Sequence, residues 1–224
     1  MKFINLALIN PDIATAAVTT QNDIATFIYE DCWSQVSIGE ELTLEMVQAL
    51  LKGNSLARKN SIDERRVEGQ IKAWWRLLDL IEDEEFSVTA DIAFQLASFN
   101  SYPIATLRPI KKTKNISDIF YFIAESLKEY ECVFDRAFLV FLSMVLMDIY
   151  NGYNLNTARM MMNGVLLSSG YPAASFPIIH RQKFFSAVAL LDETNDHRQL
   201  YDLMRSSFDE RVIRFLSYDV CRRK

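Results

Sequence analysis

The sequence predicts an all-α protein, a helical bundle around a central buried helix pair, with one short β-hairpin flap. Three observations predict this class. Apolar residues recur at helical spacing along most of the 224 residues, Gly and Pro are scarce (6 and 5), and the segment 133–150 is apolar on nearly every side. Because no stretch has the composition of a linker, we expect a single domain over residues 1–224.

Capping residues and stop signals place the individual helices. We expect helices at about 44–51, 62–81, 90–99, 118–131, 133–150, 157–168, 180–192, 196–206 and 209–219. The expected start signals are Thr43, the capping-box sequence SIDE at 61–64, Ser87 or Thr89, and Ser117, and the expected stop signals include Gly53 and Gly170.

One segment interrupts the helical period. The stretch SYPIATLRPIKKTK (101–114) contains two prolines and several β-branched residues, which favour an extended flap or a small hairpin. Its basic residues could hold an acidic partner, but a solvated flap edge is the interpretation we favour.

Composition narrows the classes of function. A net charge of −5 argues against a nucleic-acid binder, and three distant cysteines suit a reducing compartment without disulfides. The N-terminal apolar run is too short and too polar for a signal peptide, and the most apolar run, AFLVFLSMVLM (137–147), is too short to cross a membrane. We therefore expect a soluble, cytoplasmic protein without a nucleic-acid or membrane partner.

The stretch NGYNLNTARMMMN (151–163) is the most informative part of the chain. Its polar residues Asn154, Asn156 and Thr157 lie where a loop should lead into a helix, with Arg159 one turn further on. The first N–H groups of a helix lack intrahelical partners, so this could be an anion site. The alternative is an ordinary helix cap formed by Asn156 or Thr157, with Arg159 paired to a core carboxylate.

Other catalytic constellations find little support. The two histidines, His180 and His197, have no metal-ligand spacing, so we expect no metal site. No nucleophile elbow anchors a catalytic triad. The run of methionines at 160–162 is expected to fill core space.

From Asn154 onward, NLNTARMMMNGVLLSSGYP followed by IIHRQKFFSAVALLD resembles the second half of a Fic (Fido) domain. The signature of that family is HxFx[D/E]GNGRxxR, followed by a helix, a Gly-Tyr-Pro turn and an RxxYYxAL segment. Upstream, SQVSIGEELTLEMV is similar to the regulatory segment of the family, and TLRPIKK, with Arg108 and Lys111, stands at its target-docking flap. The resemblance covers about 33–204. It implies a regulatory-like segment at about 33–52 and a core at about 61–206, before the C-terminal helix at about 209–219.

The resemblance implies transfer of AMP from ATP to a protein hydroxyl. In the family, the His is the general base, the acidic residue holds a divalent cation, the glycines cradle the phosphates and the Arg neutralises charge. In this sequence only Asn154 and Arg159 are retained. The replaced positions are Asp148 for His, Tyr150 for Phe, Gly152 for the acid, Tyr153 and Leu155 for the glycines, and Asn156 for the first Arg.

The regulatory-like segment also lacks a residue that is typical of the family. The position of the inhibitory Glu is Ile38, which follows Ser34 and precedes Gly39. The Arg position that this Glu would pair with is Asn156. A brake on nucleotide binding serves no purpose in a protein that binds no nucleotide.

These replacements predict a catalytically inactive regulator or protein-binding module that has a protein partner and no cofactor. The alternative is a divergent nucleotidyl- or phosphate-group transferase with Asp148 as base, in which Asn154, Asn156, Thr157 and Arg159 hold phosphate. ATP and Mg²⁺ are expected only in that case. A toxin–antitoxin role, implied by the family alone, is a weaker alternative, and homodimer formation stays open.

Overall fold

The computed structural model describes residues 25–29, 43–54, 62–100, 115–150, 154–174, 176 and 180–206. This part of the chain is almost entirely helical, with a short helical stretch at 25–29 and no β-strand. The labelled helices are α3 (Leu44–Leu51), α4 (Ile62–Glu82), α5 (Ala90–Asn100), α6 (Ile116–Leu127), α7 (Val133–Met147), α8 (Asn154–Ser168), α9 (Arg181–Thr194) and α10 (Arg198–Ser206). The all-α class is confirmed.

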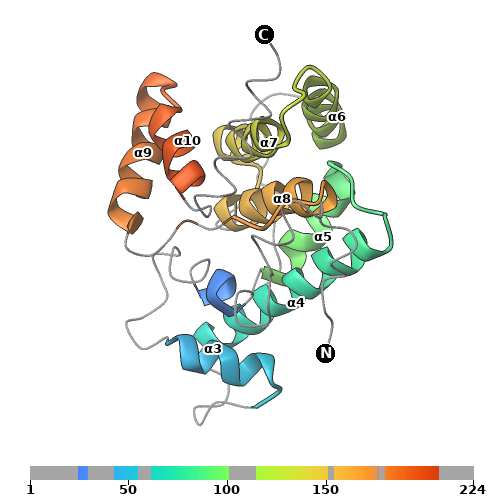
Figure 1. Cartoon of the computed structure of the whole chain (residues 1–224), viewed down its shortest axis with the longest axis vertical. Coiled ribbons are helices and arrows are strands. Elements are labelled where there is room, and N and C mark those ends of the chain that lie inside the picture. Colours follow the sequence, from blue (N-terminus) through green and yellow to red (C-terminus); the bar gives the residue numbers. More distant parts are fainter. Residues whose placement is uncertain are drawn as a thin grey trace.

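Helix α8 lies at the centre of the molecule, where it contacts α7, α5 and α4 (Figure 1). Every residue from Asn156 to Leu167 is buried, polar ones included. Helix α7 packs along α8 but leaves Leu146 and Met147 exposed at its C-terminal end. The central helix pair is confirmed. However, the helix that is buried on all sides is α8, and not the more apolar 133–150 segment, because α7 covers α8 and itself faces solvent on one side.

Side-chain caps are present at the starts of α3, α5 and α6. The Thr43 hydroxyl accepts a hydrogen bond from the Met46 N–H (3.3 Å), and the Thr89 hydroxyl accepts one from the Ile92 N–H (3.4 Å), as the sequence predicted. The prediction for Ser117 was wrong. The Asn115 side chain caps α6 and accepts from the Ser117 N–H (3.2 Å), which places Ser117 inside the first turn.

Two left-handed residues end the central helices. Gly170 (φ 79°) follows α8, as predicted from the Gly-Tyr-Pro sequence. Asp148 (φ 45°) ends α7 at Met147, three residues before the expected Tyr150. An aspartate tolerates this conformation better than most non-glycine residues, because its short polar side chain can hydrogen-bond locally.

The aromatic ring of Phe86 packs directly against Gly164 on α8. A Cβ added at Gly164 would lie 2.0 Å from the ring. We expect Gly164→Ala to lower the free energy of unfolding by about 1–3 kcal/mol, because the ring must be displaced from the core. Urea denaturation followed by circular dichroism measures this change.

The control for this prediction is the same substitution in a Phe86→Ala background. There the ring is gone, and alanine should be neutral or stabilising by up to about 1 kcal/mol, because it favours helix over glycine. A Gly164→Ala penalty of the same size in both backgrounds would show that the ring is not its cause.

Several predicted features lie outside the described residues. These are the β-hairpin flap with Arg108 and Lys111, the regulatory-like positions Ser34, Ile38 and Gly39, the helix at 209–219, and the loop residues Gly152 and Tyr153. In the described part of the chain, no helix is both long enough and apolar enough to cross a membrane.

Candidate functional site

The turn between α7 and α8 is held together by the side chain of Asn154, the first residue of α8. Its amide oxygen accepts hydrogen bonds from the backbone N–H groups of Ile149 (3.0 Å) and Tyr150 (3.3 Å). Its amide nitrogen donates to the Met144 carbonyl (2.6 Å), which also accepts from the Asp148 N–H (3.1 Å). One buried side chain thus forms hydrogen bonds with three polar backbone groups at the end of α7 and just after it, and links them to the start of α8.

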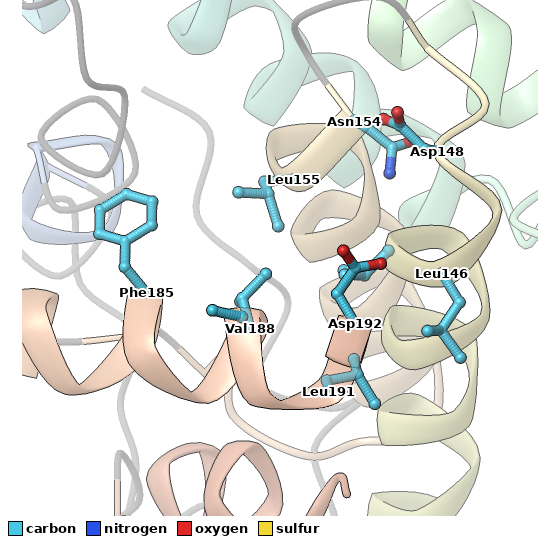
Figure 2. A pocket seen from close by; sticks show the side chains of 10 residues that line it. Leu146, Asp148, Asn154, Leu155, Phe185, Val188, Leu191 and Asp192 are labelled. Atoms are coloured by element: carbon cyan, nitrogen blue, oxygen red, sulfur yellow. The ribbon is translucent and has the colours of Figure 1, made fainter. Parts of the chain in front are cut away.

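Beside this turn is a pocket of about 380 Å³, within the range that small-molecule sites occupy. Figure 2 shows Phe185 and Val188 projecting from α9 toward Leu155, while Asp148 and Asn154 lie at one edge. The Asp192 side chain projects from α9 toward the space between α7 and α8. The described lining residues are Val145, Leu146, Asp148, Asn154, Leu155, Phe185, Val188, Ala189, Leu191 and Asp192.

The charge of this pocket is negative. Asp148 is half-buried and Asp192 is exposed, and none of the described lining residues is Lys, Arg or His. The rest of the described lining is apolar except for Asn154. The described lining therefore carries two acidic side chains and no basic one, which favours a cation over an anion.

The other predicted phosphate-site residues lie inside the protein. Asn156 is 2% exposed, Thr157 is fully buried and Arg159 is 1% exposed, and none of them lines the pocket. Helix α8 begins at Asn154 rather than at Thr157, so Asn156 and Thr157 lie within its first turn. The prediction that one of them caps the helix was therefore wrong. The structure thus brings Asp148 and Asn154 together and separates them from Arg159.

A buried polar chain joins α8 to α4. The Arg159 guanidinium donates to the Asn156 amide oxygen (2.7 Å), and the Asn156 amide nitrogen donates to the Gln70 side-chain oxygen (3.4 Å). The Arg159 guanidinium also lies over the Phe184 ring of α9, 6.0 Å from its centroid. These contacts hold a charged residue in the core, and no sequence pattern indicated Gln70 as a member of the chain.

Tyr150, which the resemblance in sequence aligns with a Phe of the Fic family, is fully buried. Burial raises the pKa of its phenol well above the usual range, so the hydroxyl stays protonated. Among the described residues, this hydroxyl has no hydrogen-bond partner. Tyr150 therefore acts mainly as a large packing residue below the turn.

The two histidines are far apart. His180 precedes α9 and His197 follows it, so they flank opposite ends of a 14-residue helix that is about 21 Å long. The described residues contain no group of three His, Cys, Asp or Glu side chains that could hold a metal ion.

Asn163 is a structural residue whose role sequence reasoning missed. From the middle of α8, its amide nitrogen donates to the Ala174 carbonyl (3.0 Å) and its amide oxygen accepts from the Ala174 N–H (2.8 Å). This pair of bonds fastens the segment that follows the Gly-Tyr-Pro turn onto α8. A polar residue among the apolar ones of a buried helix was the only signal that could have indicated it.

Neither a protein-family model nor a curated protein matches this sequence. Solved structures do match its fold. A fragment of Fic-1 from C. elegans superposes with a TM-score of 0.71 at 16% identity, over 92% of this chain and 66% of that chain. The chain has a Fic fold. A variant of the same Fic-1 fragment gives a TM-score of 0.70 at 18% identity, over 92% of this chain and 65% of that chain.

The Fic fold agrees with the resemblance in sequence that runs from the α7–α8 turn through α9. This chain spans about two thirds of the length of the Fic-1 fragments that it matches.

Proposed function

We propose that this Fic-fold chain has lost ordinary AMP transfer and works through protein contact, as a regulator or binding module. The observation that carries the proposal is the placement of charge. The retained Arg159 is bonded to Asn156 inside the core, while both charged residues among the described pocket lining are acidic. A triphosphate at this pocket would meet carboxylates where it needs cations.

The sequence at the signature positions supports the same proposal. Gly152 replaces the acidic residue that holds the cation in the family, and Tyr153 and Leu155 replace glycines. A Cβ hinders both positive φ and close approach of the backbone to phosphate. In this proposal the protein works in the cytoplasm, without a cofactor.

A magnesium ion on the phosphates fits poorly with the described residues of this site. The Asn154 amide oxygen already accepts two backbone N–H groups at 3.0 and 3.3 Å. The signature position whose acidic side chain would hold the ion is Gly152, which has no side-chain oxygen, and the Asp148 carboxylate stands at the position of the general base instead. The proposed function does not require this ion.

The direct test is incubation of the full chain with labelled ATP, Mg²⁺ and a cell lysate. We expect no labelled protein beyond the level of a reaction without the chain. Label that is transferred to a protein, and that disappears in an Asp148→Ala variant, would contradict the proposal.

One observation favours a second candidate, a divergent transferase. Asp148 is half-buried, lines the pocket and lies at the position of the general base of the family. In that function, Asp148 would take the proton from an acceptor hydroxyl. A nucleotide or sugar nucleotide should then raise the melting temperature, because a ligand that binds only the folded state stabilises it. The absence of a shift across a nucleotide panel would count against this candidate.

A further inference from the structure

The pocket between α7, α8 and α9 has walls and a charge that fit one kind of group. The walls are apolar and half-buried, formed by Leu155 and the side of α9 that carries Phe185 and Val188. Carboxylates lie at two places on the lining, Asp148 at the end of α7 and Asp192 on α9 (Figure 2). An apolar passage with carboxylates suits a side chain that has a hydrocarbon stem and a cationic head.

The Asp192 carboxylate is available for such a contact. It is exposed and, in the described part of the chain, it forms no ion pair or hydrogen bond. The neighbouring Asp196 differs, because Arg198 binds it through both carboxylate oxygens. Asp192 is thus a carboxylate on the pocket wall that no cation of the described residues neutralises.

We propose that this pocket receives an arginine or lysine side chain of a partner protein. The stem would pack against Leu155, Phe185 and Val188, and the cationic head would bind the Asp192 carboxylate. The net charge of −5 favours a basic partner at longer range. This inference rests on the proposed function, because it supplies the chemistry of the protein contact made at the same site.

The pocket volume is compatible with this occupant. About 380 Å³ exceeds what one arginine side chain fills, which leaves room for the partner backbone at the mouth. The same volume could admit a nucleotide, but the two carboxylates disfavour its phosphates. The charge of the pocket lining therefore favours a cationic side chain over a nucleotide, whereas the pocket volume does not distinguish between them.

The test is a titration of the isotope-labelled full chain with a short capped peptide, Gly-Arg-Gly, followed by the backbone amide signals of α9. We expect saturable shifts at the amides of Val188 and Ala189, with a dissociation constant in the millimolar range. A Gly-Gln-Gly peptide should cause no saturable shift. Raising the salt concentration should weaken binding, because exposed charges are screened.

Two variants locate the contact. Asp192→Asn removes one charge with little change in shape. It should weaken binding of the arginine peptide about fivefold, which corresponds to the upper end of the free energy of an exposed ion pair. The matched control, Glu193→Gln, removes a charge from the next residue of α9, which is exposed and does not line the pocket. It should leave the affinity unchanged within about twofold.

Three results would overturn the inference: no saturable shift with the arginine peptide, equal weakening by Asp192→Asn and Glu193→Gln, or tighter binding of ATP with Mg²⁺ at the same amides. Binding of free agmatine, a small guanidinium compound, with none of the peptide would assign the pocket to a small amine and would also contradict a protein side chain. The labelling experiment with ATP tests AMP transfer separately. If the peptide experiment contradicts the inference, the proposed loss of AMP transfer is still decided by the labelling experiment alone.

Discussion

Replacing Asn154 with alanine should lower the free energy of unfolding by about 3 kcal/mol, because two buried backbone N–H groups lose their acceptor and each such loss costs about 1–3 kcal/mol. The groups belong to Ile149 and Tyr150, both of which are fully buried. The Met144 carbonyl loses the Asn154 donor but keeps the Asp148 N–H. Urea denaturation gives the free energy, and thermal melting should fall by about 6–12 °C for a chain of this size.

The matched control is Asn54→Ala. Asn54 is exposed, so its loss should change stability by about 0.5 kcal/mol or less. If Asn154→Ala were as mild as this control, the turn between α7 and α8 would not depend on the side chain of Asn154. A buried asparagine at this position would then need a functional explanation in place of a structural one.

Replacing Asn163 with alanine should lower the free energy of unfolding by about 2–4 kcal/mol, since both polar backbone groups of Ala174 lose their partner in a dry environment. Asn163 is 1% exposed, so water has little access to replace the lost bonds. The segment at 171–174 should detach from α8 first, because this pair of hydrogen bonds fastens it there. Amide hydrogen exchange at Ala174 measures that local opening, beside the global change from urea denaturation.

Ser168→Ala is the control for this second substitution. Ser168 lies at the end of the same helix, and its hydroxyl makes only a local bond to the Val165 carbonyl. Its removal should cost about 0.5 kcal/mol or less. Similar hydrogen exchange at Ala174 in wild type and in Asn163→Ala would show that the segment is held by packing alone.

The hydrogen bonds of Asn154 also bear on the function of the pocket. Asn154 lies at the pocket and yet makes all of its described hydrogen bonds to the backbone of the α7–α8 turn. The hydrogen bonds of Asn154 therefore serve the turn itself. The charged side chains of the described pocket lining are those of Asp148 and Asp192.

The sequence by itself determined the helical class and many of the helix ends. Thr43, Thr89 and Gly170 act through hydrogen bonds or backbone angles within a few residues, so their effect can be predicted without knowledge of the rest of the chain. Where two local signals competed, the prediction failed. Asn115 starts α6 ahead of Ser117, because either residue can cap and the earlier one does.

Only the tertiary structure decided which polar residues of α8 line the pocket and which lie in the core. Asn156 and Arg159 have the composition of a phosphate site, but their hydrogen bonds to each other and to Gln70, 86 residues before Asn156, keep them inside the protein. Periodicity cannot show this, since burying a polar group is favourable only when a partner distant in sequence satisfies it. The sequence also could not show that Asp148 and Asp192 line one pocket, because they come from the end of α7 and from α9, and only the tertiary structure shows that these parts of the chain lie beside the same cavity.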